Sequence, residues 1–225
     1  MLTADKNLWF EKIFAVYNRN LFSRRFNSLQ ISGLNFLNDK AENTPLIIYA
    51  NHSSWWDGLT AFQISRRAGL DSFIMMEEKQ LKKLRFFRRL GAFSVVREKN
   101  REALKSMNYA VEILMKNPKR TLWIFPQGEI LPNEVRPLRF YNGLPRIIKS
   151  FEKCSIACLA MRYEFLDEYK PDIFVKIKKI ELSAIELKLK PQQISDILSN
   201  YLTVCLDELK AEIVNKRFSE FEKIC

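Results

Sequence analysis

The chain has 225 residues, 47% of them hydrophobic, which suits one domain with a sizeable core. Its 37 lysines and arginines exceed 26 aspartates and glutamates by 11, which suits nucleic acid, an anionic membrane surface or phosphorylated substrates without choosing among them. One histidine and no CxxC pair exclude a cysteine–histidine zinc cluster, so the four cysteines are expected to be reduced thiols in a cytosolic protein.

Residues 7–26 predict the first helix. Large apolar side chains such as Trp9, Ile13 and Phe14 recur at helical spacing, with basic residues such as Lys12 and Arg19 beside them. The pattern is typical of a helix that lies in a membrane interface, and also of a helix that packs on the core with its charges in solvent. No apolar run approaches the ~18 residues that span a bilayer.

From residue 28 onward, short apolar runs alternate with helical patterns. Strands are expected at 29–32, 46–50, 72–76, 92–96, 121–125, 155–161 and 173–182, the last near a sheet edge because lysines alternate along it. Helices are expected at 59–68, 103–116, 144–151 and 192–217. This order predicts an α/β fold with a mixed, mostly parallel sheet flanked by helices, in which ligands bind at the carboxyl ends of strands.

The histidine lies at such a strand end. His52 follows the buried run 46–50, and Asp57 stands five residues later, where the next helix begins. Positions five apart in one helix differ by about 140°, so the pair meets only if His52 lies in the turn. Asp57 would then orient the imidazole, and His52 would act as a general base. The alternative is a helix-capping histidine with Asp57 as a helix-dipole partner.

Two further strand ends carry polar residues. Arg97 follows the run 92–96 and suits an anionic group, although a salt bridge with Glu98 or Glu102 explains it equally well. The segment Phe125-Pro126-Gln127-Gly128-Glu129 follows the run 121–125 and is either a substrate-orienting turn or simply a tight turn.

These motifs together resemble the lysophospholipid and glycerolphosphate acyltransferase family. Residues 51–57, Asn-His-Ser-Ser-Trp-Trp-Asp, match its NHxxxxD motif in full. Residues 91–97 are similar to its second motif, and residues 125–130 match its FPEGTR-like third motif in part. The resemblance implies that His52 and Asp57 are catalytic, and that Arg97 and Phe125, Pro126, Gln127, Gly128 and Glu129 bind substrate.

The resemblance also implies the reaction. An O-acyltransferase of this kind moves a fatty acyl group from acyl-CoA or acyl-carrier protein to a lipid hydroxyl and needs no metal or other cofactor. The third motif departs from the family pattern, because Gln127, Glu129 and Ile130 stand where Glu, Thr and Arg are usual. A phosphate-binding cation is therefore missing, unless Arg136 or Arg139 replaces it, and an acceptor less anionic than lysophosphatidic acid is expected.

The expected partners are a membrane surface, the lipid acceptor and the thioester donor, without nucleic acid. Residues 1–27 are predicted to be a membrane-associating helical segment and residues 28–225 the acyltransferase domain. The protein is expected on the cytoplasmic side of the membrane, as a peripheral or monotopic protein. The alternative function is a basic, non-catalytic module that binds lipid or nucleic acid, which the net charge of +11 favours. The oligomeric state is left open.

Overall fold

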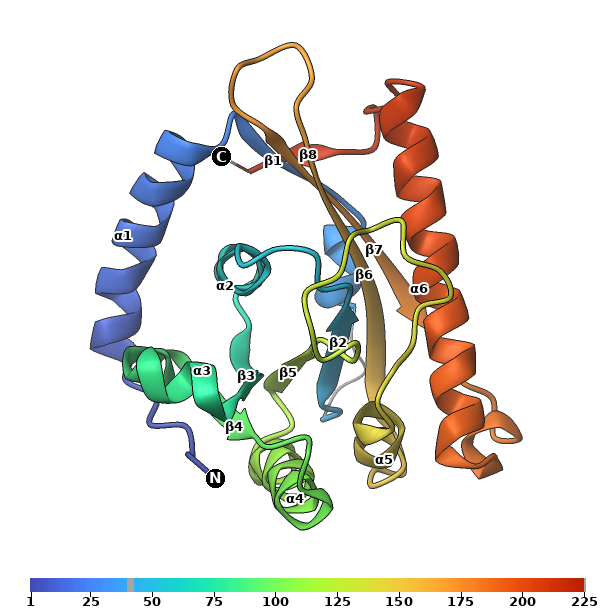
Figure 1. Cartoon of the computed structure of the whole chain (residues 1–225). Coiled ribbons are helices and arrows are strands. Elements are labelled where there is room, and N and C mark those ends of the chain that lie inside the picture. Colours follow the sequence, from blue (N-terminus) through green and yellow to red (C-terminus); the bar gives the residue numbers. More distant parts are fainter. Residues whose placement is uncertain (40–42, 225) are drawn as a thin grey trace.

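The computed structural model describes residues 1–39 and 43–224. Its sheet has eight strands in the order β4-β3-β5-β2-β6-β7-β1-β8 (Figure 1). The strands are β1 Ser28–Ser32, β2 Leu46–Ala50, β3 Asp71–Glu77, β4 Ala92–Val95, β5 Arg120–Ile124, β6 Ser155–Glu164, β7 Asp172–Ile180 and β8 Glu222–Lys223. The helices are α1 Leu8–Arg25, α2 Asp57–Arg67, α3 Glu78–Lys83, α4 Asn100–Lys116, α5 Gly143–Ile148 and α6 Pro191–Val214, with 3₁₀ turns η1 Leu34–Leu37, η2 Arg85–Leu90 and η3 Glu186–Lys188.

The predicted α/β class, the mostly parallel sheet and the N-terminal helix are confirmed. From β4 to β6, neighbouring strands pair in parallel: β4 with β3, β3 with β5, β5 with β2, and β2 with β6. Strand β6 pairs antiparallel with β7, and so does β1 with β8. The carboxyl ends of β2, β4 and β5 therefore lie at one edge of the sheet, where the three predicted site segments begin.

Two cores lie on the two faces of the sheet. In β2, Ile47 and Tyr49 belong to the core beneath α4, α5 and α6, while Ile48 and Ala50 belong to the core beneath α1 and α2. Alternate residues of a strand point to opposite faces, so a central strand needs apolar side chains throughout. Figure 1 shows α1 and α6 on opposite sides of the sheet. The continuous apolar run before His52 therefore reflects burial from both sides.

Strand β7 is an interior strand, although only β1 and the two-residue β8 lie between it and one end of the sheet, which agrees with the position near an edge that its lysines predicted. It lies between β6 and β1. Its lysines are compatible with this position because α6 covers them with carboxylates: Lys176 pairs with Glu212 at 2.5 Å and Lys178 with Glu208 at 2.5 Å. Burial alone would lower the pKa of Lys176, but the hydrogen bond to Glu212 and the charges of Glu212 and Glu208 together outweigh it and raise that pKa.

Helix α1 is apolar on two faces. Phe14 and Phe22 are buried against the domain, whereas Trp9 and Tyr17 are 72% and 57% exposed. The ring of Phe14 packs edge-on against Phe62 of α2 at 5.1 Å. The interpretation as a helix packed on the core is thus confirmed for the inner face, whereas contact of the exposed face with a membrane stays a prediction.

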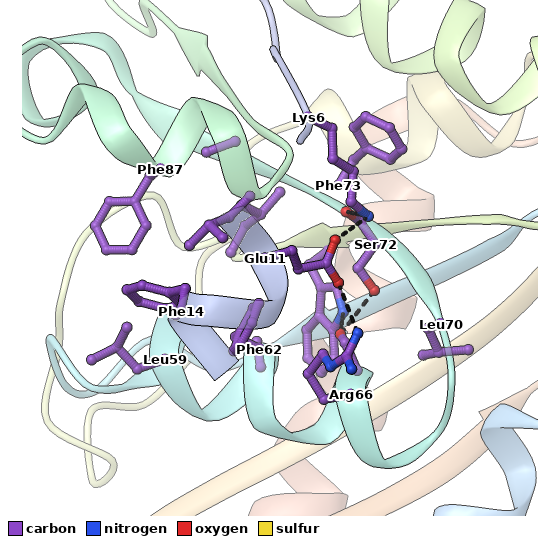
Figure 2. Close-up of a pocket in the computed structure, with 17 residues that line it drawn as sticks. Lys6, Glu11, Phe14, Leu59, Phe62, Arg66, Leu70, Ser72, Phe73 and Phe87 are labelled. Atoms are coloured by element: carbon purple, nitrogen blue, oxygen red, sulfur yellow. Dashed lines mark hydrogen bonds and ion pairs between the residues drawn. The ribbon is translucent and has the colours of Figure 1, made fainter. Parts of the chain in front are cut away.

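Charged groups also fix α1 to the domain. Figure 2 shows the Glu11 carboxylate between Lys6 and Arg66, beside a small pocket of about 50 Å³. Glu11 lies 3.6 Å from Lys6 Nζ and 3.3 Å from Arg66 Nη1. Because Glu11 is buried, these two cations compensate a carboxylate that would otherwise be costly beneath the helix. No helix in residues 1–39 and 43–224 is both long and apolar enough to cross a membrane.

Candidate active site

His52 and Asp57 are in direct contact. His52 Nδ1 lies 2.8 Å from Asp57 Oδ2, because His52 occupies the turn after β2 and Asp57 is the first residue of α2. A carboxylate only accepts hydrogen bonds, so the proton of this contact belongs to Nδ1, and in the neutral imidazole Nε2 keeps a lone pair. The His52 side chain is 23% exposed and lines a cleft, whereas Asp57 is fully buried. This arrangement gives an oriented imidazole with one basic nitrogen.

The Asp57 carboxylate accepts hydrogen bonds from the turn and from β6. Oδ2 also accepts hydrogen bonds from the backbone N–H groups of Ser53 at 2.7 Å and Ser54 at 2.9 Å. Oδ1 accepts one from the Tyr163 hydroxyl at 2.7 Å, at the carboxyl end of β6. Burial and the Asp57 charge raise the pKa of Tyr163 well above its usual value, so its hydroxyl stays protonated and donates. Four donors thus compensate the buried charge.

Side chains behind the turn fix the backbone of His52. The buried Gln127 accepts a hydrogen bond from the His52 N–H at 2.8 Å through Oε1. Asn51 bonds to both the N–H and the carbonyl of Met161 on β6, at 2.8 and 2.9 Å. The His52 carbonyl accepts from Leu131 N–H at 2.9 Å. The chain segment after β5 therefore positions the histidine, and the Gln127 side chain lies behind it rather than in the cleft.

The cleft beside His52 has a volume of about 870 Å³. Phe125 stacks on the imidazole, with ring centroids 4.7 Å apart and planes 24° from parallel, and Pro126 also lines the cleft. Trp55 lines it as well and is 56% exposed, whereas its neighbour Trp56 packs edge-on against Phe26 of the core. Further along, the wall is apolar and comes from β3, α4 and α5, including Met75, Leu104, Met107 and Leu144. Such a lining suits a hydrocarbon chain.

Arg97 lies just beyond the carboxyl end of β4. Its guanidinium lies 3.9 Å from the Glu77 carboxylate and 5.8 Å from the centre of the Tyr141 ring. Its Nη1 would lie 2.6 Å from a Cβ added to Gly128, whose φ of +75° also favours glycine. The third-motif turn therefore packs on the second-motif arginine, and Gly128 leaves the space that Arg97 occupies. The salt-bridge alternative is partly correct, but with Glu77 in place of Glu98 or Glu102.

Neither arginine suggested as a replacement cation lines the cleft. Arg136 pairs with Asp207 of α6 at 2.6 Å and donates to two backbone carbonyls, and Arg139 is exposed elsewhere. The cleft instead contains Arg146 of α5, together with Glu129. Sequence patterns gave no signal for Arg146 or Tyr163, since both lie outside the three motifs. Across the described chain, no three His, Cys, Asp or Glu side chains are grouped to hold a metal ion.

Three segments that follow β2, β4 and β5 thus build one cleft around an oriented histidine. The model of the Acyltransferase family matches residues 28–162, more than half of the chain. The chain therefore belongs to this family, which comprises the lysophospholipid and glycerolphosphate acyltransferases, as its ordered motifs predicted. Its domain is an acyl-transfer domain. No curated protein matches the chain significantly.

Proposed function

We propose that the protein is an O-acyltransferase that moves a fatty acyl group from a thioester, acyl-CoA or acyl-carrier protein, to the hydroxyl of a lipid acceptor. The contact between His52 Nδ1 and the buried Asp57 carboxylate, at 2.8 Å beside the cleft, carries this proposal. It leaves Nε2 as the base, which is the group that a hydroxyl nucleophile requires.

In the proposed reaction, His52 Nε2 takes the proton of the acceptor hydroxyl while the oxygen attacks the thioester carbonyl. Asp57 stabilises the resulting imidazolium through Nδ1. The tetrahedral intermediate then expels the thiolate, which takes the proton back from Nε2. One ester bond forms and one thioester bond breaks, so the histidine and the protein end unchanged.

The other predicted site residues divide into two roles in this proposal. Arg97, Phe125, Pro126 and Glu129 line the cleft and are proposed to contact substrate. Gln127 and Gly128 are proposed to act by positioning other site residues. Gln127 binds the His52 backbone, and Gly128 leaves the space that Arg97 occupies.

We also propose that residues 1–27 attach the catalytic domain, residues 28–225, to the cytoplasmic face of a membrane. The outward face of α1 supports this, because Leu8, Trp9 and Val16 are each more than half exposed. Exposed cationic residues on the same helix, Lys12, Arg19, Arg24 and Arg25, suit anionic lipid head groups. The alternative, a module that binds lipid without catalysis, shares this surface but has no use for the histidine turn.

Replacing His52 by alanine tests the catalytic proposal. We expect the turnover of acyl thioester to fall by a factor of about 10²–10⁴, the usual value of a general base. The circular dichroism spectrum and melting temperature should stay close to wild type, because His52 is partly exposed. Asp57→Asn should also lower turnover, since an amide gives His52 a wrong or uncharged partner. Undiminished acyl transfer by the His52→Ala protein would contradict the mechanism.

A further inference from the structure

The cleft carries no net charge, although the protein as a whole carries +11. Among the described residues, the charged side chains that line it, besides His52, are Glu77, Arg97, Glu129 and Arg146. These two carboxylates and two guanidiniums cancel. The surplus of positive charge therefore lies outside the cleft, away from the substrate.

Arg97 is already partly neutralised. Glu77 lies 3.9 Å from its guanidinium, and the Tyr141 ring and Gly128 confine it. A phosphate monoester carries up to two negative charges and needs unpaired cations nearby. Arg97 can still donate a hydrogen bond to a substrate, but the negative charge of Glu77 lies beside it.

Glu129 lies at the same cleft without compensation. Within the described parts of the chain, its carboxylate has no cation within 4.0 Å, and the residue is exposed. Unpaired carboxylates repel phosphate and accept hydrogen bonds from hydroxyl or ammonium groups. Arg146 is likewise without a carboxylate partner in this part of the chain, and it lines the cleft from α5. One unpaired group of each sign thus lines the cleft in the described part of the chain.

Resting on the proposed function, we infer that the acceptor is a lysolipid whose head group has no net charge, and that Glu129 determines this specificity. A zwitterionic phosphodiester and a neutral sugar share this chemistry. The first would place its phosphate toward Arg146 and its ammonium toward Glu129, and the second would donate hydroxyls to Glu129. A phosphate monoester next to the acylated hydroxyl carries up to two negative charges, which Glu129 would repel and Arg146, as the single unpaired cation of the described cleft lining, would compensate only in part.

The test compares three acceptors that share one acyl chain and differ in the head group: lysophosphatidic acid, lysophosphatidylethanolamine and a glycosylated monoacylglycerol. Each is supplied in neutral detergent micelles with the same thioester donor, so that surface charge does not decide the outcome. We expect kcat/KM to be at least about tenfold lower for lysophosphatidic acid than for the better of the other two. Whichever of these two is preferred identifies the source of the uncharged head group.

Glu129→Gln should raise the ratio of lysophosphatidic acid use to uncharged-acceptor use by about tenfold, because it removes the repulsion at nearly constant shape. Glu168→Gln is the matched control, since it removes one charge from the exposed β6–β7 hairpin and should leave the ratio unchanged. A wild-type preference for lysophosphatidic acid, or an unchanged ratio in Glu129→Gln, would overturn the inference and leave the acyltransferase proposal intact. Absence of transfer to all three acceptors would overturn both.

Discussion

At the scale of single residues, Tyr163 extends the His52–Asp57 pair to a third member. Its hydroxyl is the donor to Asp57 Oδ1, at 2.7 Å, and it lies 3.2 Å from Thr60 Oγ1. Asp57 is fully buried, so an oxygen that lost this donor would keep its desolvation cost without compensation. Tyr163 is therefore a positioning residue, which acts on the histidine through the carboxylate.

Tyr163→Phe removes the hydroxyl and keeps the ring that packs 5.9 Å from Phe26. We expect kcat to fall by about 10- to 150-fold, which corresponds to about 1.5–3 kcal/mol for a hydrogen bond to a charged group, with little change in acceptor KM. Steady-state kinetics over a range of acceptor concentrations measures the two separately. An equal rise in KM would mean that Tyr163 shapes the binding cleft instead.

Sequence reasoning found the residues whose partners are close along the chain and missed those whose partners are distant. His52 and Asp57 are five residues apart and are joined by a turn that the sequence pattern predicts. Tyr163 is 106 residues beyond Asp57, and only the pairing of β6 with β2 brings them together. Gln127 lies at the His52 turn, but no sequence pattern indicates that its amide oxygen accepts a hydrogen bond from the His52 backbone.

At the scale of elements, α1 buries one apolar face and exposes another, and only the exposed face is proposed to meet a membrane. Its inner face holds Phe22, 1% exposed, and its outer face holds Trp9, 72% exposed. Periodicity predicted the helix but not which aromatic residues face the core, because both faces are apolar. The exposed fraction of each side chain shows which face it belongs to, so the two faces can be tested independently.

Phe22→Ala should lower the free energy of unfolding by about 3–5 kcal/mol, since it removes a fully buried ring. Trp9→Ser should change stability by about 0.5 kcal/mol or less but weaken sedimentation with vesicles rich in phosphatidylglycerol. Denaturant melts and vesicle sedimentation measure the two effects. Tyr201→Ser is the control for an exposed aromatic residue, on α6 across the sheet, and should sediment like wild type. Equal sedimentation of the Trp9 variant and wild type would remove α1 from the membrane proposal.

At the scale of the whole molecule, the sheet could be predicted in class but not in order. Apolar runs and the family motifs indicate parallel strands with helices between them. The interior place of β7 is compatible with its lysines because carboxylates of α6, 36 and 30 residues away along the chain, pair with Lys176 and Lys178. A strand that looks amphipathic alone is thus an interior strand once its partner helix is added.

The strand order also sets how the enzyme should respond to heat. His52 follows β2, which has β5 and β6 as neighbours, whereas Arg97 follows β4, the four-residue strand that ends the sheet beside β3. Sheets open from their margins inward, so the wall that carries Arg97 should loosen at temperatures where the histidine turn is still held. On warming below the melting transition, acceptor KM should therefore rise before kcat declines, and kinetics at successive temperatures would show it. If kcat and KM changed together, the site would be melting as one unit. In the proposed mechanism, a base that follows a central strand is expected to give the chemical step a wider thermal range than acceptor binding.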